Sequence, residues 1–347
     1  MTVQHREPRP WSAGSATGIG SLPGTDLAEA LRTVLGELPD LPHLPELPAR
    51  GPSAAITGRT AALLAGLSVE LHPSGWRFCN HPGLDARRAT AMLRSDLDLL
   101  EELAADHDGP LKLQAAGVWT LAATTETRNG NKALADAGAR RDLAESLAEG
   151  LTAHVAEVAR RLPRASLVLQ LDEPALPSVL AGRIPTASGF STLSAVPAPD
   201  AADLLGRVVH AVRTATGVPV AVHCCAPGVP VDLLRRAGAD AIALDTALLT
   251  KAQYDPLAEA VETGASLWLG ATAALPPEPR PAGLSGVAGS VRADGERLLR
   301  LWRDLGLDPD QLAGSVVVTP ACGLAGASPA YARAVLERVR QVGAGLR

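Results

Sequence analysis

The sequence predicts an α/β fold, a TIM barrel of eight strand–helix units. Eight short apolar runs recur along its 347 residues, and helix-like sequence follows each run. Near-continuous apolar runs are typical of parallel strands covered on both faces. Eight such units over about 300 residues favour one closed barrel over the alternative, a doubly wound sheet.

The eight predicted strands are separated by the helix-like segments. They lie within residues 16–23, 41–48, 111–121, 166–177, 218–227, 241–249, 266–274 and 315–325. The second is the weakest, because proline has no N–H to give to a sheet and is rare in a central strand.

The intervening segments read as helices. Residues 141–162 carry one apolar stripe at three- and four-residue spacing, the pattern of a helix with one buried face. Residues 229–237 and 328–342 look similar, with Ser328 as cap and Pro329 as first helical residue. Two irregular stretches read as insertion loops, 68–90 (with Trp76, Cys79 and His81) and 275–290.

Composition narrows the class of protein. No break marks a linker, so we expect a single domain over residues 1–347. A net charge of −5 argues against nucleic acid or an anionic membrane surface as partner. No apolar run approaches the ~20 residues of a membrane span, and the polar start is unlike a signal peptide. With only four cysteines, we expect a reducing, cytoplasmic setting, where clustered cysteines are metal-binding or catalytic.

Several polar residues stand at strand ends, where barrels of this type place their active sites. Ser21 closes the first run and Asp172 and Glu173 the fourth, while His223 to Cys225 close the fifth. Asp245 closes the sixth run and Cys322 the eighth.

This pattern predicts a metal site. Alternate residues of a strand share a face, so His223 and Cys225 point together and Cys224 points away. Asp245 and Cys322 could complete a tetrahedral site, and imidazole with thiolate favours zinc. The alternative is structural: a free Cys is often a small buried hydrophobe. In that alternative Asp245, or Asp172 with Glu173, would only cap or support a turn.

The motifs then resemble a known family. "TGIGSLP", "QLDEPALP", "HCC", "LD" and "TPACGL" together resemble the C-terminal catalytic barrel of cobalamin-independent methionine synthase. The likeness runs from Thr17 to the last helix, and the short, single-barrel methionine synthase II-like proteins are the most similar. It implies a TIM barrel of the methionine synthase/uroporphyrinogen decarboxylase-like type.

The resemblance implies a zinc ion held by His223, Cys225, Asp245 and Cys322. The family's carboxylate is usually Glu, so Asp245, one methylene shorter, is the least secure ligand. The family's zinc binds homocysteine as a thiolate and presents it to a methyl donor, giving methionine. Coordination deprotonates a thiol that is otherwise mostly protonated at neutral pH.

The resemblance also implies a pocket for the amino-acid end of homocysteine. Ile19, Gly20 and Ser21 match the segment that holds the carboxylate. Asp172 matches the Asp that binds the ammonium group, and Glu46 aligns with a second acidic contact. Two carboxylates for an ammonium group and N–H donors for a carboxylate suit an α-amino acid.

The sequence departs from the family at the methyl-donor side. We expect a chain without the N-terminal half that helps long members bind folate. The folate-stacking Trp falls near Thr124, with Trp119 offset from it, and an acidic folate contact falls at Ser178. The seventh strand lacks the family's proton-donating His, so no catalytic residue is assigned. We therefore expect a methylated corrinoid protein, whose leaving group needs no proton, rather than folate.

Three other functions stay open. The acceptor could be another small thiol, as in coenzyme M transferases, although a sulfonate would want arginines rather than Asp172. A uroporphyrinogen decarboxylase-like lyase shares the superfamily but has no Cys cluster. A non-catalytic zinc- or amino-acid-binding protein would retain the site without turnover.

Overall fold

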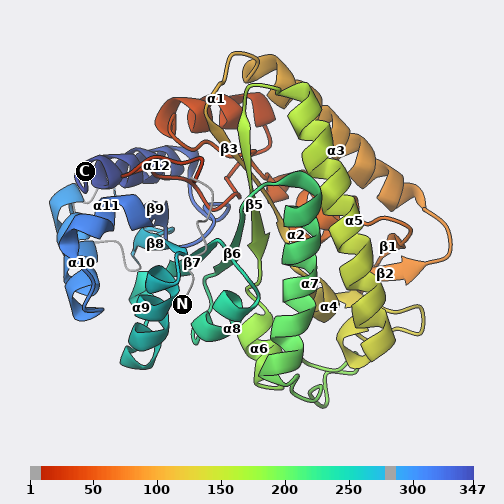
Figure 1. The fold of residues 1–347 in the computed structure, drawn as a ribbon. Helices are drawn as coiled ribbons and strands as arrows, with labels where there is room; N and C mark the ends of the chain where they lie inside the picture. Colours follow the sequence, from red (N-terminus) through yellow and green to blue (C-terminus); the bar gives the residue numbers. More distant parts are fainter. Residues whose placement is uncertain (1–8, 278–286) are drawn as a thin grey trace.

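The computed structural model describes residues 9–277 and 287–347. Its main sheet holds six parallel strands, which follow one another in the order of the sequence (Figure 1). They are β3 (Pro110–Ala116), β5 (Ser166–Asp172), β6 (Val220–Cys224), β7 (Ala241–Asp245), β8 (Ser266–Thr272) and β9 (Val316–Pro320). Parallel neighbours need a crossover, and helices supply it here, as in a βα barrel.

Two N-terminal segments, 15–22 and 42–46, close this sheet into a ring. The first lies between β9 and the second, which in turn lies beside β3. The backbone N–H donors and acceptors that join the ring are Thr17 to Val318 (3.0 Å), Glu46 to Gly20 (3.0 Å) and Lys112 to Pro42 (2.8 Å). Eight parallel segments thus surround one interior, and the predicted TIM barrel is confirmed.

Both closing segments form only isolated bridges rather than full strands. In segment 42–46, Pro42 and Pro45 have no N–H to donate, which shortens the ladder. The weakness expected of the second apolar run is therefore real, yet the run still occupies a place in the barrel.

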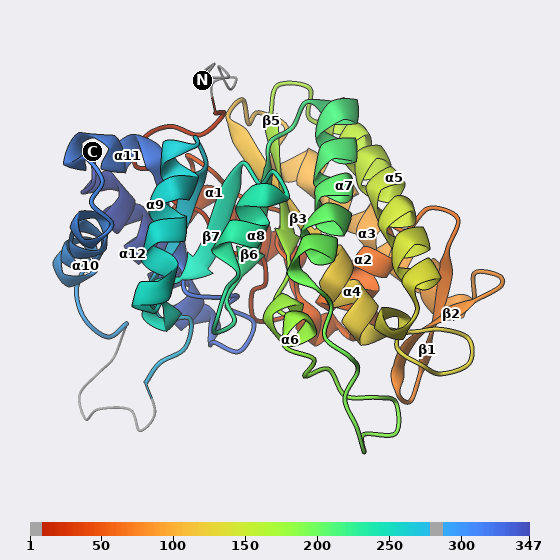
Figure 2. The ribbon, with the colours of Figure 1, turned by 60° about the horizontal axis from the view of Figure 1, so that its bottom comes forward.

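Helices cover the outside of the barrel (Figure 2). They are α1 (Leu27–Glu37), α2 (Ile56–Ala61), α3 (Leu84–Leu103), α4 (Val118–Thr124), α5 (Ala137–Arg161), α6 (Leu176–Leu180), α7 (Ala198–Thr216), α8 (Val231–Arg236), α9 (Tyr254–Glu262), α10 (Val291–Asp304), α11 (Leu312–Ser315) and α12 (Pro329–Ala344). The three predicted helices correspond to α5, α8 and α12. Ser328 caps α12 as expected, because its hydroxyl accepts from the Tyr331 N–H. None of the helices within the described ranges combines the length and apolar character that a membrane crossing requires.

The prediction of one irregular stretch over 68–90 is wrong. Strands β1 (Ser68–His72) and β2 (Gly75–Cys79) form an antiparallel hairpin there, β4 (Thr125–Glu126) pairs with β2, and α3 begins at Leu84. The hairpin projects from the barrel on the side away from α10 (Figures 1 and 2). Its polar residues hide the strand pattern, and Val69 and Trp76 are its two deeply buried residues. Of the second predicted loop, 275–290, residues 278–286 lie outside the described residues.

The barrel interior has an apolar lower part. Eight buried residues fill it, separate from the larger core between barrel and helices: Trp11, Leu41, Val168, Ala221, Ala241, Ala243, Trp268 and Val317. The rings of Trp11 and Trp268 meet edge to face, 5.4 Å apart. These residues lie toward the strand starts. The polar residues at the strand ends lie at the opposite end of the barrel.

Candidate metal centre

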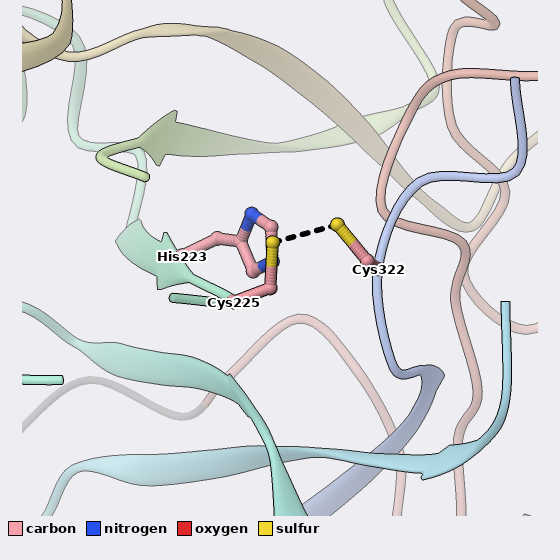
Figure 3. A group of neighbouring side chains, drawn as sticks. All are labelled: His223, Cys225 and Cys322. Carbon is pink, nitrogen blue, oxygen red and sulfur yellow. Dashed lines mark hydrogen bonds between the residues drawn. The ribbon is translucent and has the colours of Figure 1, made fainter. Parts of the chain in front are cut away.

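Three metal-ligand side chains meet at the strand ends. His223 lies on β6, Cys225 directly follows it, and Cys322 lies in the loop after β9 (Figure 3). One ligand atom of each lies within 4.8 Å of the others. The sulfurs of Cys225 and Cys322 face each other at 2.6 Å. The structure thus brings together residues 99 positions apart in the sequence, counted from His223 to Cys322.

The neighbouring Cys224 takes the opposite direction, as strand alternation predicts. It is 1% exposed and belongs to the apolar core between barrel and helices. This burial raises the pKa of Cys224 to about 12. Cys224 is therefore a packing residue, whereas Cys225 is partly open to the barrel mouth.

Asp172 orients the His223 ring. The residues are register partners at the ends of β5 and β6, and His223 Nδ1 donates to Asp172 Oδ1 at 2.8 Å. A carboxylate only accepts, so the proton of neutral His223 lies on Nδ1 and the lone pair lies on Nε2. Nε2 is buried and has no hydrogen-bond partner. A histidine braced by a carboxylate, with its other nitrogen unpaired, is how metal-binding histidines are commonly held.

The two thiols complete a donor set that fits a metal ion. The sulfurs of Cys225 and Cys322 share one hydrogen bond in which either can donate, and this contact lowers the pKa of Cys322 and raises that of Cys225. Cys322 is thereby favoured as a thiolate, the form that binds metals. One imidazole nitrogen and two sulfurs are the donors typical of zinc. The residues present fit zinc, with fewer protein ligands than a closed structural site.

Asp245 does not join this cluster. It ends β7 and is half-buried, and its carboxylate accepts from the Ala247 N–H at 2.9 Å, capping the short helical turn Thr246–Leu248. Its carboxylate is not among the ligand atoms that lie within 4.8 Å of one another. Three of the four predicted ligands therefore meet in the structure, and ligation by Asp245 stays a prediction.

The residues expected to hold an amino acid border the same site. Ser21 lies against the loop that carries Cys322: its carbonyl accepts from Leu324 N at 2.8 Å, and a Cβ on Gly323 would collide with its hydroxyl. Ser21 also bridges to Glu46 on the next segment. The segment with Ile19 and Gly20 thus runs beside the metal cluster, and Asp172 belongs to both groups.

Glu46 is a buried carboxyl group beside the Ile19–Ser21 segment, 4% exposed. Burial raises its pKa to about 7, while the positive charge of Arg59, 3.7 Å away, acts in the opposite direction. Arg59 in turn pairs with Asp96 at 2.6 Å. Burial therefore favours the neutral form of the Glu46 carboxyl group, and a cation bound nearby would stabilise its charged form.

Glu173 has a structural role, unlike its neighbour Asp172. It is fully buried, and its carboxylate accepts from the backbone N–H groups of Trp119 and Thr120 at 2.9 and 2.7 Å. It thereby caps α4, and a Cβ on Gly117 would collide with it. Within "DEP", Asp172 therefore bonds to His223, whereas Glu173 caps a helix.

Sequence reasoning missed two buried polar residues that hydrogen-bond to the Ile19 carbonyl, Lys112 and Gln170. Both are 0% exposed and face the barrel interior. Strand alternation in "LKLQ" and "LVLQLD" was the available signal, because the leucines on either side face the outer core. Trp119, by contrast, is buried in α4 and donates to Ala201 O, so it packs in the core and does not face the mouth.

Comparison with known proteins decides the family. Residues 109–344 match the family described as the catalytic domain of cobalamin-independent synthase. This match covers more than half of the chain. The chain belongs to the cobalamin-independent synthase family. Membership confirms the family resemblance of the sequence motifs and places the cluster of His223, Cys225 and Cys322 within a methyltransferase-type enzyme family.

Solved structures agree with the fold. A B12-independent methionine synthase from Shewanella sp. W3-18-1, in complex with selenomethionine, has a TM-score of 0.59 at 13% identity, over 97% of this chain and 98% of that chain. A methyltransferase from Methanosarcina mazei has a TM-score of 0.55 at 14% identity, over 98% and 94%. The search of curated proteins found no relative of this chain.

Proposed function

We propose that this protein is a zinc-dependent methyltransferase that moves a methyl group to the thiol of homocysteine, giving methionine. The observation that carries the proposal is the meeting of His223, Cys225 and Cys322 at the barrel mouth, with Asp172 bonded directly to the histidine. Family membership supports the methyl-transfer chemistry. The expected single domain and cytoplasmic setting are part of the same proposal.

The chain's own residues hold the metal. His223 Nε2 and the sulfurs of Cys225 and Cys322 are the proposed ligands, and Asp172 keeps the Nε2 lone pair pointed toward the sulfurs. When bound, zinc would supply a Lewis-acid centre that keeps a coordinated thiol deprotonated. Asp245 is the predicted fourth ligand, which requires one of its carboxylate oxygens to approach the cluster.

The amino-acid end of the acceptor binds beside the metal ligands. Asp172 and Glu46 accept hydrogen bonds from the ammonium group. The backbone from Ile19 to Ser21 and the Ser21 hydroxyl donate to the carboxylate. These two acidic side chains would repel the sulfonate of an acceptor such as coenzyme M, which makes an amino-acid thiol the better acceptor.

The proposal for the methyl donor rests on the residues at the end of β8. Its last residues are Gly270, Ala271 and Thr272, and the Thr272 hydroxyl donates to Asp294 at 3.0 Å. No histidine stands there to protonate a folate leaving group. Transfer from a methylcorrinoid protein needs no such proton. The missing histidine is the only observation that supports a corrinoid donor. The family and the Shewanella neighbour are both described as independent of cobalamin.

The test is methionine formation by the zinc-loaded protein. Homocysteine is supplied with methylcobalamin or with methyltetrahydrofolate as monoglutamate or triglutamate, and methionine is measured. We expect turnover with methylcobalamin and none for Cys322→Ser, while Cys79→Ser, on the distant hairpin, retains it. Tight binding of homocysteine without turnover of any donor would instead make the protein a binding protein.

A further inference from the structure

Gln170 connects the two parts of the proposed site. It lies on β5, fully buried and facing the barrel interior. Its Nε2 donates to the Ile19 carbonyl at 2.8 Å and to Asp172 Oδ1 at 2.7 Å. Both partners can only accept, which fixes the amide with its nitrogen toward the site. Its Oε1 is buried without a partner, so the contacts of Nε2 decide its placement.

These bonds continue to the metal ligand. Asp172 Oδ1 accepts from Gln170 and also from His223 Nδ1. An unbroken chain of hydrogen bonds therefore runs from Ile19 through Gln170 and Asp172 to His223. It crosses from the segment expected to bind a carboxylate to the ring expected to bind a metal.

The Ile19 carbonyl is held from a second side as well. Lys112 Nζ donates to it at 2.8 Å, from a side chain that is 0% exposed. The carbonyl can turn inward because Gly20 takes a φ of +154°, a backbone conformation that residues with a Cβ atom rarely adopt. Two buried donors on one carbonyl fix the direction of this segment.

We propose that Gln170 is a positioning residue that holds the Ile19–Ser21 segment and the Asp172 carboxylate in the arrangement that recognises the amino-acid end of the acceptor. The inference rests on the proposed function of the pocket. Gln170 touches neither the acceptor nor the metal: it holds the Ile19–Ser21 segment and the Asp172 carboxylate in one arrangement. A thiol without an amino-acid end gains little from that arrangement, whereas homocysteine depends on it.

The test compares two thiols and two variants in the Co²⁺-substituted protein. Homocysteine and propanethiol are titrated, and the thiolate-to-cobalt absorption gives the Kd of each without any turnover. Gln170→Met keeps the side-chain length and removes the N–H donors. Gln253→Met is the matched control, because Gln253 is a buried amide that donates to Val229 O at 3.0 Å outside the site. The thermal midpoint of each variant reports its fold.

For Gln170→Met we expect the Kd of homocysteine to rise at least about tenfold, while that of propanethiol changes less than about twofold. Gln253→Met should leave both unchanged. Equal weakening of both thiols, or no weakening of either, would overturn the role of Gln170 and leave the proposed function standing. A wild-type protein whose cobalt takes no homocysteine thiolate would overturn the proposed function itself. Should Gln170→Met not fold, Gln170→Asn, too short to reach both acceptors, is judged by the same criteria.

Discussion

The two ends of the barrel interior have opposite chemistry. Toward the strand starts, Trp268 and seven other apolar residues fill the interior. Toward the strand ends, Asp172, His223 and the sulfurs of Cys225 and Cys322 lie together. The same strands supply both: on β5, Val168 packs below while Asp172 bonds above. The contrast teaches that one strand can stabilise the fold at its start and hold a site at its end.

The largest expected effect tests the lower end. Trp268→Ala should lower the free energy of unfolding by about 3–5 kcal/mol, because it leaves a cavity in a close-packed layer. Denaturant unfolding measures the loss, and Trp268→Phe should lose less. The folded fraction should still bind zinc as the wild type does. A variant that lost zinc while keeping its stability would break the division between the two ends.

The next effect tests the upper end. Asp172→Asn should weaken zinc binding about 10–100-fold, because an amide can donate to His223 Nδ1 and so favour the wrong tautomer. Competition with a chelating dye measures the affinity. The free energy of unfolding should change little. Unaltered affinity would mean that Asp172 does not orient His223.

Glu173, next to Asp172, is expected to affect the stability of the fold and not the binding of zinc. Glu173→Gln should cost about 1–3 kcal/mol of stability, since the amide keeps one accepting oxygen and its NH₂ cannot accept from the second of the two N–H groups, those of Trp119 and Thr120. Zinc affinity per folded chain should stay at the wild-type value. Loss of zinc without loss of stability would reverse the roles assigned to the two residues of "DE".

The smallest effect concerns Asp245. Its carboxylate caps a short turn and lies outside the cluster, so Asp245→Ala should weaken zinc by less than about tenfold and remove a cap worth about 1 kcal/mol. The chelator competition measures the first effect and thermal unfolding the second. A hundredfold loss of zinc affinity would make Asp245 the fourth ligand after all.

Much of the fold and part of the site follow from the sequence for a physical reason. Periodicity reports burial, so it revealed the eight barrel segments and predicted the opposite directions of Cys224 and Cys225. The hairpin at 68–79 was not predicted, because its strands lie at the edge of the molecule, where few side chains are buried. The hydrogen bonds of Gln170 were not predicted, because they depend on distances between three segments, which no local sequence pattern encodes. Asp245 illustrates the same limit: its residue type suits a ligand, while its contacts are those of a cap.

The central claim is that the eighth strand and the His-x-Cys pair hold one metal ion. The most direct measurement is zinc per chain in the purified, reduced protein, for wild type, Cys322→Ser and the control Cys79→Ser. We predict close to one zinc in the wild type and in Cys79→Ser, and a clear loss in Cys322→Ser. Absence of zinc from reduced, metal-supplemented wild type would contradict the account, and the cluster of His223, Cys225 and Cys322 would then be a packed strand end.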